Sequence, residues 1–215
     1  NVAIGNYAGD AITSADLSVL VGYEAGTAIT TGTENMCIGA QAGQNLTTGT
    51  RTTLIGRAAG YNYDAENDNL AIGYFALGGV VNGGEYNVAI GNYSLDALTS
   101  GDYNVAVGYN SGSAINSGEA HTLVGNEAGR KITTSAHNTC IGYFAGGELT
   151  TGATNIAMGS LALDGCDTES DNLAIGFGAL GSSDLAGGEF NTGIGNTTLD
   201  ALTSADSCVA VGHGA

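Results

Sequence analysis

The sequence predicts an all-β fold, a parallel β-solenoid of about twelve coils with 17 residues each. Three observations support this prediction: a short motif around an anchoring Gly recurs from end to end, Ile, Val or Met precedes every anchor, and Gly, Asn and Thr fill much of the remainder. Gly, Asn and Thr disfavour helix, whereas β-branched residues bounded by Gly and Asn favour short strands. A unit this small cannot bury its apolar side alone, so the copies must stack.

The repeat has a nearly constant period. Ten of the twelve spacings between successive anchors are 17 residues, and the exceptions are 18 (Gly73 to Gly91) and 19 (Gly176 to Gly195). Segment 69–78 returns as 172–181, and 95–102 returns as 199–206, at offsets of 103 and 104 residues. A block of six repeats is therefore duplicated. No boundary divides the array, so we expect residues 1–215 to be a single solenoid domain and a fragment of a longer fibrous protein.

Composition excludes several classes of function. The chain has 21 Asp and Glu against 4 Lys and Arg, giving a formal net charge of −17. A chain this acidic cannot bind nucleic acid by neutralising phosphates, and it has no basic stretch for an anionic membrane surface. No run approaches 18 apolar residues, so we expect no membrane insertion.

The three residues before each anchor alternate between the two faces of a strand. Both faces are apolar in nearly every repeat, which predicts that both are buried. We assign the residue immediately before the anchor to the core of each coil: Ile4, Val21, Ile38, Ile55, Ile72, Ile90, Val107, Val124, Ile141, Met158, Ile175, Ile194 and Val211. We assign the residue two before the anchor to an axis shared with other copies of the chain: Ala3, Leu20, Cys37, Leu54, Ala71, Ala89, Ala106, Leu123, Cys140, Ala157 and Ala174. An apolar stripe of this length would be too large to stay exposed on a monomer, which predicts an oligomer.

The recurrent motif N-x-A-I-G resembles the head repeat of YadA-like trimeric autotransporter adhesins, and the longer form with a following Tyr and a T-T-G corner resembles the repeats of bacteriophage tail fibres. The resemblance covers the whole chain, and the period of 17 favours the tail-fibre version. It implies a left-handed parallel β-roll assembled as a homotrimer. The residues themselves leave handedness open, since the general crossover rule favours the right hand, and they do not separate three chains from two.

Two acidic clusters occupy equivalent places in the duplicated blocks: Asp64, Glu66 and Asp68, and Asp167, Glu169 and Asp171. Alternate spacing in an extended segment would bring three carboxylates to one side, where a hard cation such as Ca²⁺ could bridge them. The competing interpretation, which we prefer, is a solvated acidic corner. Apart from this Ca²⁺ hypothesis, we expect no cofactor.

The remaining reactive residues indicate no catalytic site, and we expect no enzyme. Cys37 and Cys140 replace Ala or Leu in the same repeat position, so we expect them to be buried and apolar. The three His residues lie in different coils, without a recurring nucleophile or base. The segment GFGALG at 176–181 matches a dinucleotide-binding pattern by coincidence, because it is the ordinary repeat with Gly178 added.

Two surface columns suggest other functions. Aromatic residues gather just after the anchors, where they could stack on sugar rings or cover a seam between chains: Tyr7, Tyr23, Tyr74, Phe75, Tyr93, Tyr109, Tyr143, Phe144 and Phe177. Pairs of Thr or Ser follow the Ile or Leu seven residues after the anchor, as at 30–31 and 47–48, and turn chemistry explains them better than an ice-binding face does.

We therefore expect a structural and adhesive protein, a segment of a trimeric viral tail fibre that projects a receptor-binding tip towards its host. The alternative is the head or stalk of a bacterial trimeric surface adhesin that binds glycan or matrix, and an ice-binding solenoid is a minor alternative. Both main interpretations place the chain outside the cell, on a virion or on a bacterial surface. Its partners would be copies of itself and a cell-surface glycan or receptor.

Overall fold

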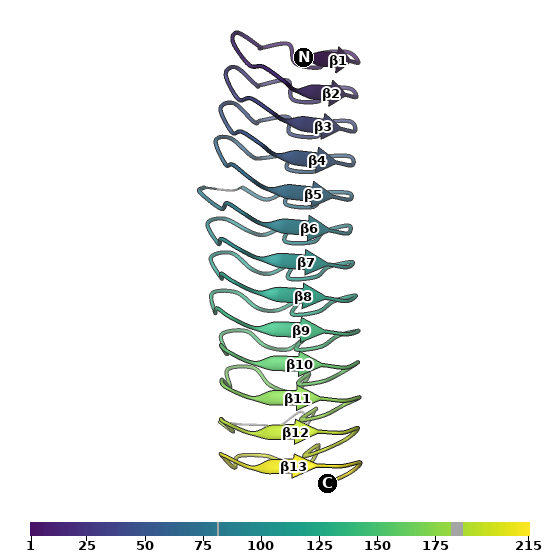
Figure 1. Ribbon diagram of the computed structural model, residues 1–215, viewed down its shortest axis with the longest axis vertical. Helices are drawn as coiled ribbons and strands as arrows, with labels where there is room; N and C mark the ends of the chain where they lie inside the picture. Colours follow the sequence, from purple (N-terminus) through teal and green to yellow (C-terminus); the bar gives the residue numbers. More distant parts are fainter. Residues whose placement is uncertain (81, 182–186) are drawn as a thin grey trace.

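A computed structural model describes residues 1–80, 82–181 and 187–215 and shows an all-β solenoid of about twelve turns. Thirteen parallel strands form one sheet in which each strand pairs with its neighbours in sequence order (Figure 1). The strands are β1 (Val2–Ile4), β2 (Val19–Val21), β3 (Met36–Ile38), β4 (Thr53–Ile55), β5 (Leu70–Ile72), β6 (Val88–Ile90), β7 (Val105–Val107), β8 (Thr122–Val124), β9 (Thr139–Ile141), β10 (Ile156–Met158), β11 (Leu173–Ile175), β12 (Thr192–Ile194) and β13 (Val209–Val211).

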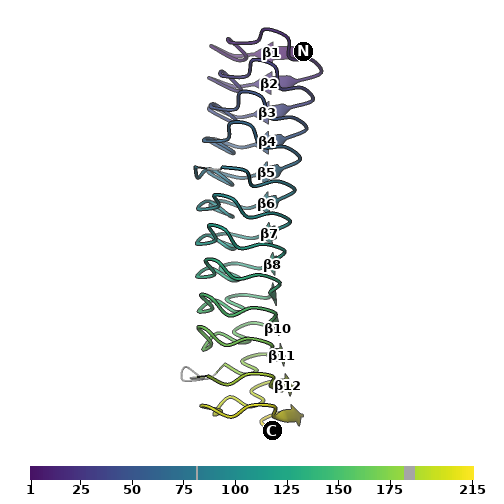
Figure 2. The same cartoon turned by 90° about the vertical axis from the view of Figure 1, so that its left-hand side faces the viewer.

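Each coil consists of one short strand followed by turns that return the chain to the next level. The sheet therefore forms one wall of the rod and the turns form the opposite side (Figure 2). Equivalent residues stack in register, as Leu20 does on Cys37, with no slip even where a coil is longer. At about 4.8 Å per level, the rod is on the order of 55–60 Å long. The described residues contain no helix, and hence none that could cross a membrane.

The anchoring glycines permit the coils to stack. Their φ angles lie between 129° and 143°, a conformation that residues with a side chain rarely adopt. A Cβ on any of the first twelve would lie 2.1–2.6 Å from the carbonyl oxygen of the next anchor. The anchor amide also continues the ladder, as when Gly22 N donates to Ile4 O at 2.8 Å. Only Gly satisfies both the conformation and the spacing.

A buried column, most often Asn, lies just before the strands and ties the coils together. Asn87 shows the pattern: its Nδ2 donates to Gly101 O at 2.9 Å, and its Oδ1 accepts from the backbone N of Asn104 at 2.9 Å. Both bonds recur from Asn104, whose Nδ2 donates to Gly118 O. Each such side chain replaces lost water contacts with hydrogen bonds in two directions, which makes burial of a polar group tolerable.

Our sequence interpretation assigns the two faces of the strands the wrong way round. The residues two before the anchor, expected on a shared axis, lie in the chain's own core: Leu20, Cys37, Leu54, Ala71, Ala89, Ala106, Leu123, Cys140, Ala157 and Ala174 are all 0% exposed. Ala3, in the first coil, is exposed. The residues immediately before the anchor, expected in the core, are instead half-buried or exposed on the outer side: Ile4, Val21, Ile38, Ile55, Ile72, Ile90, Val107, Val124, Ile141, Met158, Ile175, Ile194 and Val211.

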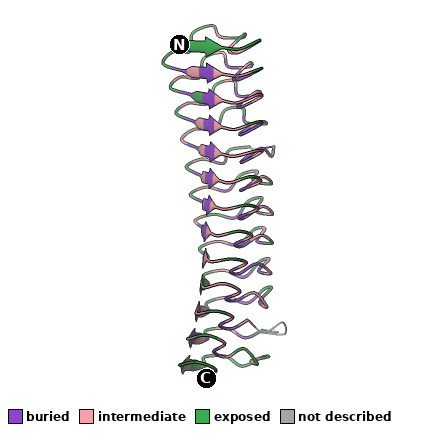
Figure 3. Ribbon diagram, turned by 90° about the vertical axis from the view of Figure 1, so that its right-hand side faces the viewer, coloured by how far each residue is buried: buried purple, intermediate pink, exposed green. Residues whose placement is uncertain are grey.

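The physical reason for this reversal is the narrowness of the coil. A core closed by one strand and a wall of turns has room for one side chain from each three-residue strand, so the central residue points inwards and its two neighbours point outwards. Figure 3 shows the result, with buried strand centres between less buried ends.

The inner side chain of each coil is matched by the residue four after the anchor. Where the strand centre is Leu or Cys, that residue is Gly, as with Leu54 and Gly60, and a Cβ at Gly60 would lie 2.7 Å from the Leu54 side chain. Where the strand centre is Ala, the residue four after the anchor is usually Leu. Ala71 is matched in this way by Leu77, which is fully buried. In most coils either the strand or the facing turn supplies the one large side chain, and this keeps the core filled.

Candidate functional site: the outer face of the sheet

The outer face of the sheet carries two parallel columns of apolar side chains. One column contains the residue immediately before each anchor, and the other contains the residue three before it. Ile156 and Met158, on the two sides of Ala157, are each 39% exposed, whereas Ala157 is 0% exposed. Most other members of both columns are half-buried. The face is therefore a continuous apolar stripe along thirteen levels.

Charge is absent from this stripe. Neither column contains Asp, Glu, Lys, Arg or His, although the chain as a whole is strongly acidic. The only polar members are Thr53, Thr122, Thr139 and Thr192, all on the same column. An apolar surface without charges has the composition of a protein interface core rather than of a solvated face.

Aromatic residues border the stripe on both edges. Beyond the carboxyl ends of the strands, Tyr93 packs edge-on against Tyr74 (ring centroids 5.2 Å apart) and Tyr109 (6.3 Å). Beyond the amino ends, Tyr86 and Tyr103 stack face to face at 5.2 Å and are 48% and 60% exposed. Aromatic residues of this exposure favour contact with another surface.

The few cations lie outside the stripe. Arg51 forms an ion pair with Asp68 at 2.6 Å, and its hydrogen bonds hold the pKa of Asp68 below the usual range. Arg130 and Lys131 both pair with Glu148. Among the described residues Arg57 has no ion-pair partner, and its guanidinium lies over the Tyr74 ring at 5.5 Å.

The two acidic clusters do not form cation sites. Asp64 accepts a hydrogen bond from the Thr47 hydroxyl. The buried Glu66 accepts from the backbone amides of Asp64 and Ala65. Asp68 forms an ion pair with Arg51. The second cluster repeats this separation: Asp167 accepts from Thr150, Glu169 from two backbone amides and Asp171 from Thr154. In the described part of the chain no three Asp, Glu, His or Cys side chains gather as metal ligands.

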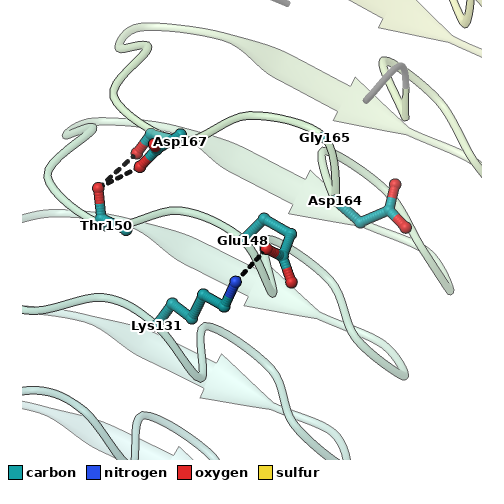
Figure 4. Close-up of a pocket in the computed structure, with 6 residues that line it drawn as sticks. All are labelled: Lys131, Glu148, Thr150, Asp164, Gly165 and Asp167. Atoms are coloured by element: carbon teal, nitrogen blue, oxygen red, sulfur yellow. Dashed lines mark hydrogen bonds and ion pairs between the residues drawn. The ribbon is translucent and has the colours of Figure 1, made fainter. Parts of the chain in front are cut away.

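A shallow groove of about 310 Å³ lies on the turn side of the rod and is lined by Lys131, Glu148, Thr150, Asp164, Gly165 and Asp167 (Figure 4). Lys131 and Glu148 pair with each other, and Asp167 is occupied by Thr150. Partial burial raises the pKa of Asp164. Most of the charged side chains in the groove already have partners, and no large apolar or aromatic side chain lines it, so its chemistry does not favour a small-molecule ligand.

The buried reactive residues are unsuited to chemistry. Cys37 and Cys140 are buried as the sequence predicts, but in the coil interior, and burial raises the pKa of each thiol to about 12. His121 takes a place in the Asn column: its Nδ1 accepts from Asn138 N at 3.1 Å, so its Nε2 carries the proton and donates to Ser135 O at 2.9 Å. These groups stabilise the rod.

The paired Thr column is also engaged within the chain. Thr13 Oγ1 donates to Thr30 O, Thr30 Oγ1 to Thr47 O, and Thr133 Oγ1 to Thr150 O, each to the coil below. The first hydroxyl of each such pair thus bonds to a neighbouring carbonyl, and the second residue, as at Thr31, Thr48 and Thr134, stays exposed. Sequence reasoning recognised the turn role of these residues but did not identify the outer stripe.

The signal that would have found the stripe is the pairing of strand centres with Gly or Leu four after the anchor.

No family model matches the chain, and no curated protein or solved structure does either. The outer face therefore has to be interpreted from its own chemistry.

Proposed function

We propose that the chain is a structural segment of a trimeric viral tail fibre, in which three left-handed rods cover one another's outer sheet faces and hold a receptor-binding tip away from its base. The observation that carries this proposal is the uncharged apolar stripe along all thirteen strands. Covering this stripe removes apolar area from water at every level, so the stabilisation grows with the length of the rod.

The borders of the stripe support a ring of copies rather than a face-to-face pair. In a ring, the edge beyond the carboxyl ends of one sheet meets the edge beyond the amino ends of the next. Tyr74, Tyr93 and Tyr109 would then lie against Tyr86 and Tyr103 of the adjacent copy. Arg57, which pairs only with a ring in its own chain, lies on this border and would gain access to carboxylates across the seam.

The mechanism of such a segment is stiffness. Every level is joined to the next by the strand ladder and by the buried Asn column, so the rod resists bending along its length. The acidic surface, −17 for each chain, keeps assembled rods apart and soluble outside the cell. A bacterial trimeric adhesin would use the same mechanics at a cell surface.

A charge placed on the stripe tests the proposal. Ile141→Asp puts a carboxylate on the outer face, where covering it would leave three like charges unpaired at one level. We expect the variant to remain folded by circular dichroism and to elute as single chains, while Thr151→Asp, with the same charge on an exposed corner, still assembles. Assembly of Ile141→Asp with wild-type affinity would contradict the proposal.

Binding of a cell-surface glycan is a second candidate, favoured by the exposed aromatic residues. The irregular coils between β5 and β6 and between β11 and β12 are its expected site, although residues 81 and 182–186 lie outside the described part of the chain. A glycan array probed with the assembled protein, and with segments 79–85 and 182–189 deleted in parallel, separates this activity from a purely structural role. Loss of signal on deletion supports binding, and an array without signal for either protein removes it.

A further inference from the structure

The loop between β5 and β6 contains the only Asn-Gly pair in the sequence, Asn82-Gly83. This loop lies in the coil from Gly73 to Gly91, which is lengthened to 18 residues, and it reaches farther from the sheet than its neighbours (Figure 1). Both residues are exposed. An exposed Asn followed by Gly is chemically labile, because no side chain hinders attack of the next backbone nitrogen on the Asn amide.

The space around Gly83 is open, and the backbone on either side of it is hydrogen-bonded. Gly83 has a φ of 101°, and a Cβ built on it would meet nothing within 4 Å. The segment is fixed on both sides, since Asn82 N donates to Thr99 O at 2.5 Å and Gly84 O accepts from Asn69 Nδ2 at 2.9 Å. A tethered, unobstructed Asn-Gly pair is open to solvent and keeps a defined position relative to its surroundings.

A buried carboxylate contacts the reacting nitrogen. Glu66 is 5% exposed, its Oε2 accepts from two backbone amides in its own corner, and its Oε1 accepts from Gly83 N at 3.2 Å. The hydrogen-bonded proton is the one that must leave when Gly83 N becomes a nucleophile. General-base assistance requires a base within this distance of the proton that it removes.

We propose that Asn82 is a site of self-catalysed deamidation, in which Glu66 acts as the base for the Gly83 amide. Gly83 N forms a bond to Asn82 Cγ while its proton moves to Glu66 Oε1. The proton then returns to the departing amide nitrogen, the Cγ–Nδ2 bond breaks, and ammonia leaves a succinimide. Water opens this ring at either carbonyl and yields Asp or isoaspartate at position 82, without any oxidant, metal or cofactor.

The second six-coil block supplies an internal comparison. Glu169 accepts from Gly187 N at 2.9 Å, as Glu66 does from Gly83, but the residue before Gly187 in the sequence is Ala. The carboxylate contact is thus present in both copies, while the reactive amide is present in only one. Deamidation adds one negative charge to each chain at the first copy and none at the second, so the two loops diverge as the protein ages.

The test follows the intact chain at neutral pH and 37 °C, with peptide mass spectrometry to measure conversion and chromatography to separate Asp from isoaspartate. We expect conversion at Asn82 to exceed that at Asn116, an exposed Asn followed by Ser. Asn82→Ala, which copies the second block, should lack the product. Glu66→Gln keeps an oxygen that can accept from Gly83 N but removes the base, and should slow conversion by about tenfold or more in the folded chain.

The same measurement in urea removes the positioning of Glu66. There the wild-type chain and Glu66→Gln should convert at equal rates, and the folded wild-type chain should convert at least as fast as the unfolded one. The proposal is overturned if the folded chain is much slower than the unfolded chain, or if Glu66→Gln deamidates as fast as wild type when folded. The comparison of folded with unfolded wild type stands even if Glu66→Gln does not fold.

Discussion

The inner and outer faces of the same strands follow different rules. The inner column mixes large and small residues, Leu or Cys in some coils and Ala or Gly in others, because in most coils the facing wall of turns compensates within the same chain. The outer column before the anchor is Ile, Val or Met at every level. Varied residues with a local partner define a core, whereas uniform residues without one fit the proposed contact with another copy of the chain.

The largest expected effect comes from breaking the compensation inside a coil. Leu54→Ala removes a fully buried side chain opposite Gly60 and should destabilise the rod by about 2–5 kcal/mol. Gly60→Leu alone should also destabilise, because it collides with Leu54. The double variant reproduces the arrangement of Ala71 with Leu77 and should recover much of the loss, as thermal unfolding at fixed protein concentration would show. A double variant no more stable than the weaker single variant would disprove the pairing.

A smaller effect is expected in the buried Asn column. Burial lowers the pKa of His121 to about 4, against an ordinary value near 6.5, because the loss of water around the ring disfavours its protonated, charged form. The contribution of the neutral His121 ring to the stability of the fold is complete above pH 6.5 and is lost as the pH falls towards 4. His121→Asn restores the usual residue of the column and should make the rod about 2 kcal/mol more stable than wild type near pH 4.

The control for this change is His137→Asn, since His137 is exposed. Thermal melts between pH 4 and pH 8 should overlap for wild type and His137→Asn. If His121→Asn shows the same acid sensitivity as wild type, the histidine does not limit stability in acid.

The smallest effect concerns Asp96 on the turn side. Burial raises the pKa of its carboxyl to about 6, and one of its oxygens is buried without a hydrogen-bond partner. The pH dependence is opposite to that of His121. The stability that depends on a protonated Asp96 is present below pH 4 and is lost as the pH rises through 6. Asp96→Asn should therefore stabilise the rod at pH 7–8 by about 1 kcal/mol, after allowing for solvent screening, and change little at pH 4.

Asp200 provides the matched control, since it occupies the equivalent repeat position and is exposed. Asp200→Asn removes the same charge but should leave the melting temperature at pH 7–8 within error of wild type. An equal gain from both substitutions would assign the effect to net charge and not to burial of Asp96.

Much of this fold is predictable from the sequence, because a repeat fixes period, stacking and register together. The anchors Gly5 to Gly212, the coil length and the burial of Cys37 all follow from one recurring motif. What alternation cannot supply is which side of a three-residue strand is inside, since both sides are apolar here. That choice depends on the width of the coil, a tertiary property, and it reverses the assignment of Leu20 and Val21.

The acidic corners were unpredictable for a different reason. The spacing of Asp64, Glu66 and Asp68 suggests three carboxylates on one side, but the turn bends between them and gives each one a different partner. A period-2 argument applies to extended strands, and it fails in a corner where residue 68 has a φ of 58°.

The most direct test of the account is the mass of the undisturbed protein in dilute neutral buffer, measured by sedimentation equilibrium or native mass spectrometry. A chain of 21.2 kDa whose outer stripe is covered by copies of itself should give a species of three chains, about 64 kDa by tripling that mass, that persists on dilution. A stable, soluble species of 21.2 kDa, with the outer Ile and Val columns open to water, would contradict it.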